Sequence, residues 1–337
     1  MKFWILAVQK IRTIYLIFRQ FIFLRWKRRR INTDSKKIAF IGHSYHKKTQ
    51  SSAFFIDHLK EHYDVDVSFD ESWCRDGAQF PDLSFIDNRY LCVIFFQVVP
   101  KPEILGRITH GNIIFVPMYD QCGRWGYSDW LRFADLKIIC FSKTLHRKLI
   151  LAGLQSLYIQ YFPKPRDFSP GSRQLAFFWQ RITKLNINVI KTLFEGQAAA
   201  IHIHKAVDPG HVFVKPERDD EKNFKITYSD WFETRDEMWE EVKKRGLYIA
   251  PREYEGIGMS FLEAMAMGKA VIGVNNPTMN EYIKDKATGY LFDLSNPGPI
   301  DLSDMETVQE NAHEFISQGY IRWQNDKHRI IEFIEKR

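Results

Sequence analysis

The sequence has few cysteines, and their spacing builds neither a metal site nor a disulfide framework. The four cysteines among 337 residues are scattered, without a Cys-x-x-Cys pair: Cys74, Cys92, Cys122 and Cys140. This excludes a zinc knuckle and a small disulfide scaffold, and it favours a reducing, cytoplasmic compartment. Cys92 and Cys140 lie inside apolar runs, so we expect both in the core.

The chain also lacks low-complexity tracts, internal repeats and a basic body. The first two absences exclude a solenoid and a disordered chain, and the length favours two domains. The net charge is +7, but residues 1–30 contain nine Lys/Arg and no Asp/Glu. Of the 48 basic residues, 39 therefore remain against 41 acidic ones, and the body carries about −2. No nucleic-acid partner is predicted, because binding would need a basic face on the body.

No stretch of the first thirty residues is apolar and uncharged for the ~18 residues that a membrane span needs. At 100° per residue, the aromatic and aliphatic side chains fall on one half of a helix and the basic ones on the other. The segment closes with Arg25-Trp26-Lys27-Arg28-Arg29-Arg30. We expect residues 1–34 to form a basic amphipathic helix lying in the plane of an anionic membrane surface. An extra helix packed on the protein, or an oligomer contact, is the alternative.

Apolar runs alternate with helix-length mixed stretches in the first half of the body. The runs lie near residues 38–41, 65–67, 91–99, 112–117 and 136–141. This alternation predicts a doubly wound α/β domain with a parallel sheet, over residues 35–166. A loop is expected at residues 43–50, before a helix at about 51–62.

Ligands of such sheets bind beyond the carboxyl ends of the strands, so the residues after each run are candidates. Here they include Gly42, His43 and Asp120. The loop after the first strand also carries Lys47 and Lys48, which suit an anionic group or are simply solvated charges. The loop lacks the Gly-Lys-Ser/Thr order of a Walker motif.

No metal site and no cofactor are predicted. Asp64 and Asp66 imitate a DxD metal motif, but they alternate with Val65 and Val67 as the exposed face of a strand would. His202 and His204 alternate in the same way, and we expect them to point to solvent or to the interdomain side.

A second α/β domain is predicted at residues 167–318, followed by a C-terminal segment, 319–337, that holds a helix at about 319–336. The boundary falls in a stretch bearing Pro and Gly, residues 163–171. The next apolar run ends before Arg181 and Lys184, which therefore lie at a strand's carboxyl end.

The strongest pattern is Tyr-Ile-Ala-Pro-Arg-Glu-Tyr-Glu-Gly-Ile-Gly-Met-Ser-Phe-Leu-Glu-Ala-Met-Ala-Met-Gly at residues 248–268. Glu255 ends a strand-to-loop turn, and Gly256 and Gly258 permit close backbone approach and unusual dihedrals. A helix is expected over residues 259–267. Its N-terminal amides and dipole favour an anion above the loop.

This segment resembles the donor-binding region of GT-B glycosyltransferases, in particular the retaining Glu-x7-Glu family (family 4-like, group 1). Seven residues separate Glu255 from Glu263, and Glu281 and Gly289 match the family's downstream Glu and Gly. The resemblance implies two Rossmann-like domains that face a cleft, with a C-terminal helix that often crosses back. One departure is Met118-Tyr119-Asp120, where many relatives carry a His.

The resemblance also implies roles for individual residues. Glu255 would bind the donor sugar, and Glu263 would take the ribose hydroxyls. The amides of Gly256, Ile257, Gly258 and Met259, together with Ser260, would bind sugar and phosphate oxygens. Arg181 and Lys184 would bind the diphosphate, while Asp120 and His43 are candidates near the reacting carbon and Gly42, Lys47 and Lys48 for the acceptor side.

The implied activity is transfer of a sugar from a nucleotide-sugar to a hydroxyl acceptor with retention, in capsule, lipopolysaccharide or other cell-surface glycan assembly. With the N-terminal segment on the membrane, the protein would be cytoplasmic and peripheral on the inner face of the cell membrane, and its acceptor a glycan or lipid-linked molecule. Two alternatives stay open. A sugar-nucleotide epimerase shares the fold, and an inactive membrane-associated scaffold would keep the fold but not bind nucleotide.

Overall fold

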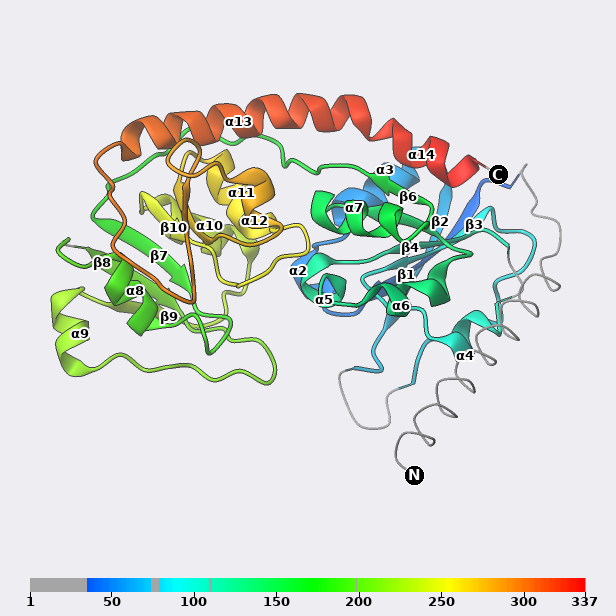
Figure 1. Cartoon of the computed structure of the whole chain (residues 1–337), viewed down its shortest axis with the longest axis horizontal. Coiled ribbons are helices and arrows are strands. Elements are labelled where there is room, and N and C mark those ends of the chain that lie inside the picture. Colours follow the sequence, from blue (N-terminus) through cyan, green and yellow to red (C-terminus); the bar gives the residue numbers. More distant parts are fainter. Residues whose placement is uncertain (1–34, 74–78, 109–110, 198, 337) are drawn as a thin grey trace. The chain divides into compact units, whose positions relative to one another are not determined.

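The computed structural model describes residues 35–73, 79–108, 111–197 and 199–336, which form two compact units (Figure 1). Within these ranges, unit 1 comprises residues 35–141, Leu145–Ile159 and residues 327–336, and unit 2 comprises Ser142–Thr144 and Gln160–Asp326. The predicted amphipathic segment, residues 1–34, lies outside the described residues. None of the helices in the described ranges has the length and hydropathy of a membrane span.

Unit 1 is built on six parallel strands in the order β2-β1-β3-β4-β5-β6. The strands are β1 (Lys37–His43), β2 (Asp64–Asp70), β3 (Cys92–Phe96), β4 (Ile113–Val116), β5 (Lys137–Cys140) and β6 (Ser156–Tyr158). The helices are α2 (His46–Thr49), α3 (Ala53–Lys60), α4 (Pro102–Leu105), α5 (Tyr119–Cys122), α6 (Tyr127–Trp130), η1 (Leu131–Phe133), α7 (Lys143–Leu151) and α14 (His328–Glu335). The predicted parallel α/β architecture is thereby confirmed. The short helix α2 occupies the stretch that was expected to be a loop.

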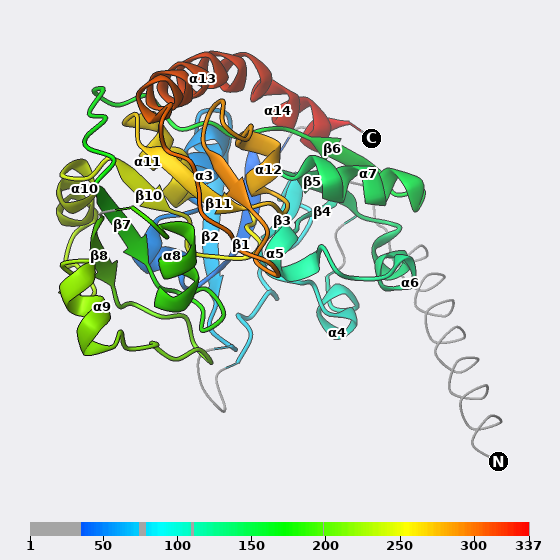
Figure 2. The same ribbon diagram turned by 60° about the vertical axis from the view of Figure 1, so that its left-hand side comes forward.

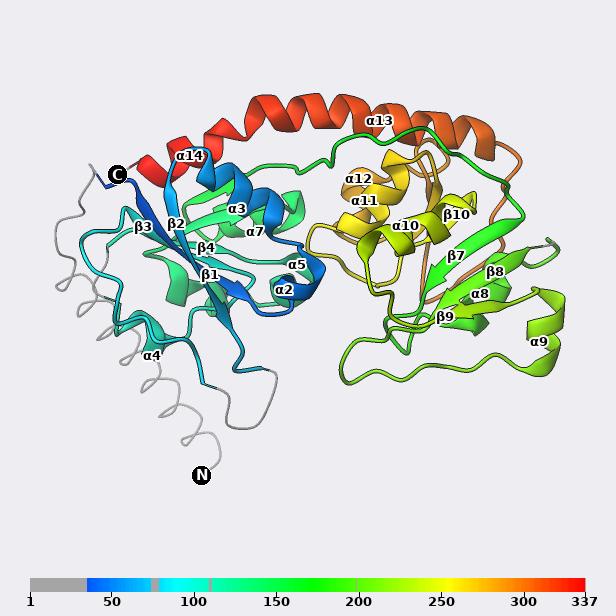
Figure 3. The same ribbon diagram turned by 180° about the vertical axis from the view of Figure 1, so that it is seen from behind.

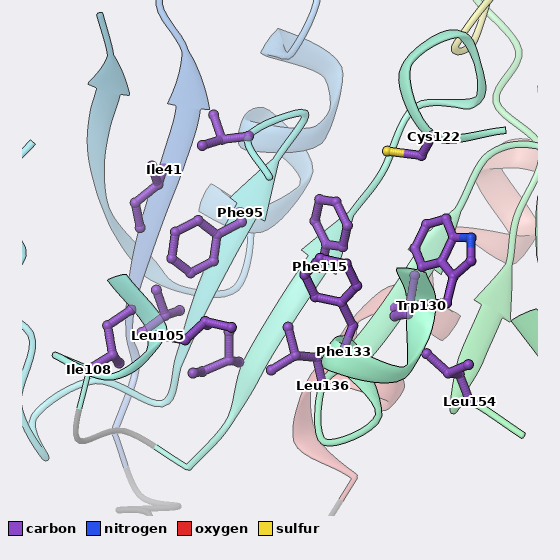
Figure 4. Packing of buried hydrophobic residues seen from close by; sticks show 14 of the residues in the cluster. Ile41, Phe95, Leu105, Ile108, Phe115, Cys122, Trp130, Phe133, Leu136 and Leu154 are labelled. Atoms are coloured by element: carbon purple, nitrogen blue, oxygen red, sulfur yellow. The ribbon is translucent and has the colours of Figure 1, made fainter. Parts of the chain in front are cut away.

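Aliphatic and aromatic side chains pack together in the core of unit 1 (Figure 4). Phe115 on β4 lies 5.2 Å from Phe133, and Trp130 lies 5.8 Å from Phe133, measured between ring centroids. All three rings are fully buried. Cys92 and Cys140 are also buried free thiols, as the apolar runs predicted. Burying each such side chain stabilises the fold by about 1.5–3 kcal/mol.

Unit 2 repeats the architecture with six parallel strands in the order β12-β11-β10-β7-β8-β9 (Figure 2). The strands are β7 (Leu175–Trp179), β8 (Ala200–His204), β9 (Thr227–Ser229), β10 (Leu247–Ile249), β11 (Ala270–Val274) and β12 (Tyr290–Phe292). The helices are α8 (Ile187–Leu193), α9 (Arg218–Asn223), α10 (Arg235–Lys243), α11 (Met259–Ala266), α12 (Met279–Tyr282) and α13 (Met305–Asp326). The helix expected at about 319–336 is instead the end of α13 and a separate helix, α14.

Polar contacts attach α14 to the rest of unit 1, beside α3 (Figures 1 and 3). The Tyr63 hydroxyl donates to Glu335 at 2.8 Å, and the Asn112 side-chain amide donates to the Ile334 carbonyl at 3.0 Å. Lys137 is 9% exposed, and its ammonium donates to the carbonyls of Ile334 and Lys336. These are the carbonyls that a helix C-terminus leaves without partners of its own.

We predict that Lys137→Met lowers the free energy of unfolding by about 1–3 kcal/mol, because the buried carbonyls at the end of α14 lose a charged donor. Equilibrium urea unfolding measures the loss. The control is Lys60→Met, which removes an exposed ammonium from α3 and is expected to change stability by at most ~0.5 kcal/mol. Equal effects of the two substitutions would contradict this role for Lys137.

Candidate functional site

The order of strands in unit 2 marks where a ligand would bind. β7 is the first strand, β8 and β9 follow on one side of it, and β10, β11 and β12 lie on the other. The direction of winding therefore reverses between β7 and β10, and such sheets bind ligands beyond the carboxyl ends of the strands at this point. Arg181 follows β7, and Arg252 follows β10. Two guanidinium groups thus come from the two strands at the switch.

Asp208, in the loop after β8, holds both guanidinium groups. One oxygen, Oδ1, accepts from Nε of Arg181 at 2.9 Å and from Nη2 at 2.7 Å. The other, Oδ2, accepts from Nη2 of Arg252 at 2.5 Å. The Asp208 amide also donates to the Arg181 carbonyl at 2.8 Å. Two positive charges are thereby fixed on one carboxylate, so the cluster of Arg181, Asp208 and Arg252 carries an excess positive charge.

The arginine–aspartate cluster is largely shielded from solvent. The side chains of Arg181, Asp208 and Arg252 are 14%, 13% and 24% exposed. Arg181 also lies over the ring of Trp179, 4.8 Å from its centroid, where the ring quadrupole attracts a cation. The sequence predicted Arg181, but it gave no signal for Asp208, because a single carboxylate in a loop has no distinctive spacing.

Lys184 does not share the carboxylate of Arg181. Its ammonium pairs instead with Glu253 at 3.0 Å, and its side chain is 58% exposed. The two predicted cations are thus held differently, Arg181 in a buried cluster and Lys184 in an exposed pair.

The loop after β10 is fixed by its backbone. Gly258 has a φ of +83° and caps α11 in the left-handed region. A Cβ at this glycine would meet the Phe261 ring at 1.9 Å, so a larger residue does not fit. Glu255 is 7% exposed, and its carbonyl accepts from the Thr278 hydroxyl at 2.8 Å. The loop therefore leads directly into the amides of the first turn of α11, which carry the positive end of the helix dipole.

Glu263 lies on the second turn of α11 and is 6% exposed. Its neighbours Phe261, Leu262, Ala264 and Met265 are fully buried, as the sequence predicted. The carboxylate pairs with Arg235, the first residue of α10. Arg235 was missed, because nothing in its sequence neighbourhood distinguishes it from a solvated helix residue.

Tyr248 of β10 is a further buried residue at this edge that the sequence did not single out. Burial raises the pKa of its hydroxyl, and the Glu255 carboxylate raises that pKa further. Ser260 and Arg181 act in the opposite direction. The hydroxyl therefore lies within electrostatic reach of three residues predicted for the site.

His202 and His204 are buried, so the expectation that they point to solvent is wrong. They are 5% and 2% exposed and bind the hydroxyls of β9. His202 Nδ1 and Nε2 lie 2.8 Å and 2.9 Å from Thr227 Oγ1 and Ser229 Oγ. His204 stacks on Phe232 at 4.8 Å. The two imidazoles lie on one side of β8, as the alternation predicts, but both faces of this strand are covered.

In unit 1, the switch between β1 and β3 brings together residues that follow these strands. Gly42 and His43 end β1, and the imidazole of His43 stacks on Trp73 at 4.5 Å. His46, 5% exposed, binds Gln97 after β3 through Nε2 and Oε1 at 2.8 Å. Burial lowers the pKa of His43, and it lowers that of His46 to about 4.

Of the other unit 1 candidates, Lys47 and Lys48 directly follow His46 on α2, and Asp120 comes from a separate segment. The ammonium of Lys47 pairs with Glu71 at 2.6 Å, while Lys48 is exposed on α2. Asp120 lies on α5, just after β4, and accepts from the amide of Gln121 at 3.0 Å. The missed residues His46, Trp73 and Gln97 come from separate segments, which the sequence pattern did not connect.

A family model described as glycosyl transferases group 1 matches residues 223–320. This segment contains the loop after β10 and α11. No curated protein matches the sequence.

Solved structures that resemble the chain share its two-sheet fold at low identity. Anabaena HepE, solved in complex with UDP and glucose, is 14% identical with a TM-score of 0.57. The lipopolysaccharide outer core galactosyltransferase WaaB is 15% identical with a TM-score of 0.55. Sucrose-phosphate synthase from Thermosynechococcus elongatus is 11% identical with a TM-score of 0.59. Each alignment covers 88% of this chain and 99% of the other, and the fold is that of the GT-B glycosyltransferases.

The buried histidines make stability depend on pH. Burial lowers the pKa of His204 from 6.5 to about 4, so the unfolded chain binds more protons between these values. Stability is therefore complete above about pH 6.5 and falls as the pH drops towards 4. At pH 5 we predict a loss of roughly 2 kcal/mol from this residue relative to pH 7.5.

Urea unfolding of the wild-type protein and of His204→Gln at both pH values tests this prediction. The glutamine does not titrate, so the variant is expected to lose roughly 2 kcal/mol less than wild type on acidification. An equal loss in both proteins would show that His204 is not held neutral by burial.

Proposed function

We propose that the chain is a glycosyltransferase that uses a nucleotide-sugar donor and binds it at the carboxyl edge of the unit 2 sheet. The observation that carries the proposal is the switch point itself. There, Arg181 and Arg252 are fixed on Asp208. The loop that holds Glu255 and opens α11 lies in the segment matched by the glycosyl transferases group 1 model.

Fixed positive groups suit a diphosphate, which is both the bound anion and the leaving group. Charge develops on the diphosphate oxygen as the bond to the sugar breaks, and preorganised cations and amides stabilise that charge. We assign this role to Arg181, Lys184, Arg252 and the amides of Gly256 to Met259. Because Asp208 already orients two of the guanidinium groups, they do not need to reorganise during the reaction.

The two glutamates are proposed to hold different parts of the donor. Glu255 would accept hydrogen bonds from hydroxyls of the transferred sugar, and Glu263 from those of the ribose. Glu263 already has Arg235 as its partner, so the ribose would share this carboxylate with a guanidinium group. A carboxylate that is buried and held by one cation is preorganised to accept further hydrogen bonds.

The acceptor is proposed to be a hydroxyl of a glycan or lipid-linked molecule that approaches the unit 1 residues. Its oxygen bonds to the anomeric carbon while the bond to the diphosphate breaks, and its proton passes to an oxygen of the departing diphosphate. Retention of configuration is proposed as well, and the resemblance of the Glu-x7-Glu motif supports it. His43 and Asp120 are candidates near the reacting carbon, with Gly42, Lys47 and Lys48 on the acceptor side.

His46 is an additional unit 1 candidate. Its Nε2 is bound to Gln97, and its Nδ1 has no hydrogen-bond partner among the described residues. Because the carboxamide Oε1 accepts from Nε2–H, Nδ1 carries a lone pair that would accept a hydrogen bond from a hydroxyl. The transfer is proposed to need no metal, since cations of the chain can stabilise the leaving group.

The glutamate roles are separable by substitution. Losing a charged acceptor costs roughly 1.5–3 kcal/mol, or about ten- to a hundredfold in affinity. We predict that Glu263→Gln weakens binding of both the nucleoside diphosphate and the intact donor, because the ribose is common to them. Glu255→Gln is expected to leave the affinity for the diphosphate nearly unchanged and to reduce turnover, because its partner is the sugar.

Calorimetric titration of each variant with the diphosphate and with the donor measures both effects. Glu237→Gln, which neutralises an exposed carboxylate on α10, is the control and is expected to match wild type. An equal loss of diphosphate affinity in both site variants would refute the division of roles. If neither variant lost affinity for the diphosphate or the donor, the result would show that this motif does not bind the donor.

Membrane association is proposed for residues 1–30, from their nine basic and no acidic residues. We predict that full-length protein sediments with anionic vesicles at low salt and that removal of residues 1–30 abolishes this, because the body carries about −2. Donor affinity is expected to survive the deletion. Full-length protein that stays in solution with anionic vesicles would overturn the membrane assignment.

A further inference from the structure

Two histidines and a glutamate come together at the C-terminal end of α3, in unit 1. They follow the order His58-Leu59-Lys60-Glu61-His62, which spaces the histidines four residues apart. This spacing places both imidazoles on one side of a helical turn. One ligand atom from each of the three side chains lies within 4.8 Å of the others. No metal site is predicted from the sequence.

The hydrogen bonds of His58 leave one of its ring nitrogens facing a carboxylate. Nε2 lies 2.9 Å from the carbonyl oxygen of Lys327, which only accepts, so this nitrogen carries the proton. Nδ1 of the neutral ring then presents a lone pair. It lies 3.1 Å from Oε2 of Glu61, which is another acceptor. A positively charged species between them is needed, either a second proton or a metal ion.

The geometry around His58 fits a metal ion. Zinc binds imidazole nitrogen and carboxylate oxygen at 2.0–2.2 Å, which in a tetrahedron separates ligand atoms by about 3.4 Å. The separation of 3.1 Å between Nδ1 and Oε2 is close to this value. Metal-bound histidines also commonly donate their other N–H to a backbone carbonyl, as Nε2 of His58 does to Lys327.

The remaining ligand and the competing cation are both at the surface. His62 is exposed, and its ring centroid lies 5.4 Å from that of His58, so a rotation of its side chain completes the set. The Lys327 ammonium is 3.1 Å and 3.2 Å from the two Glu61 oxygens. A divalent ion on Glu61 would displace this ammonium, whose side chain reaches solvent.

We propose that His58, Glu61 and His62 bind a divalent transition-metal ion of the zinc class, with water in the fourth position. The ion would be structural. It would orient His58, whose Nε2 holds the Lys327 carbonyl immediately before α14, and so fasten that helix to α3 (Figure 3). The site lies in unit 1 and uses none of the residues assigned to the donor or the acceptor.

The test is calorimetric titration of full-length, EDTA-treated protein with zinc chloride, followed by thermal melting with and without the ion. We expect one zinc ion per chain and a higher melting temperature, because an ion that binds only the folded state stabilises it. His62→Ala and Glu61→Gln should each weaken zinc binding by roughly tenfold or more and remove the thermal shift. The matched control is His211→Ala, which removes an exposed imidazole from unit 2 and should bind zinc like wild type.

The proposal would be overturned by wild-type protein that binds no zinc, which would leave a proton as the shared cation. Binding that is equal in wild type, His62→Ala and Glu61→Gln would overturn it as well, since the ion would then lie elsewhere. Glycosyl transfer is expected to persist after EDTA treatment at temperatures well below melting. Failure of the donor site and failure of the metal site are therefore separate outcomes.

Discussion

The carboxylate of Asp208 organises the edge of unit 2 on which the proposed chemistry depends. Without a carboxylate between them, the guanidinium groups of Arg181 and Arg252 would repel each other. Each group would also lose hydrating water at this shielded end of the strands. Asp208 offsets both costs by accepting from Arg181 and Arg252 at once. Because one carboxylate serves two cations, the cluster keeps an excess positive charge. A dianionic diphosphate is the natural complement of such a cluster when it is joined by helix amides.

The residues of the proposed donor site come from the loops that follow β7 and β10, not from the strands themselves. β7 and β10 are neighbours in the sheet. After β7 the chain continues to β8 and β9 on one side, and after β10 it continues to β11 and β12 on the other, so the loops that follow β7 and β10 lead in opposite directions. One loop supplies Arg181, and the other supplies Arg252, Glu255 and the cap of α11. Gly258 makes the second loop possible, because only glycine tolerates both its positive φ and the nearby Phe261 ring. The loop that depends on Gly258 and the two arginines of the charge cluster thus both follow the strands at the switch point.

Much of the fold and part of the candidate site can be predicted from the sequence. The residues that cannot be predicted share a common cause. Apolar runs such as 38–41 and 136–141 predict buried parallel strands because their pattern is local. Glu255, Gly258 and Glu263 were found because they share one continuous motif. Asp208 and Arg235 escaped, since their roles arise from side chains brought together over 27 or more residues. His202 and His204 were misplaced because alternation identifies the faces of a strand but not whether both are covered.

The central claim is that unit 2 binds a nucleoside diphosphate and the corresponding nucleotide-sugar. Its most direct test is thermal melting of the full-length protein with UDP, GDP, ADP and TDP, and with sugar nucleotides of each base. We expect one base to raise the melting temperature both as the diphosphate and as the sugar nucleotide. A ligand at a hundred times its Kd stabilises the folded state by about 2.7 kcal/mol, which is readily measured. No shift with any of the diphosphates or sugar nucleotides would contradict the account.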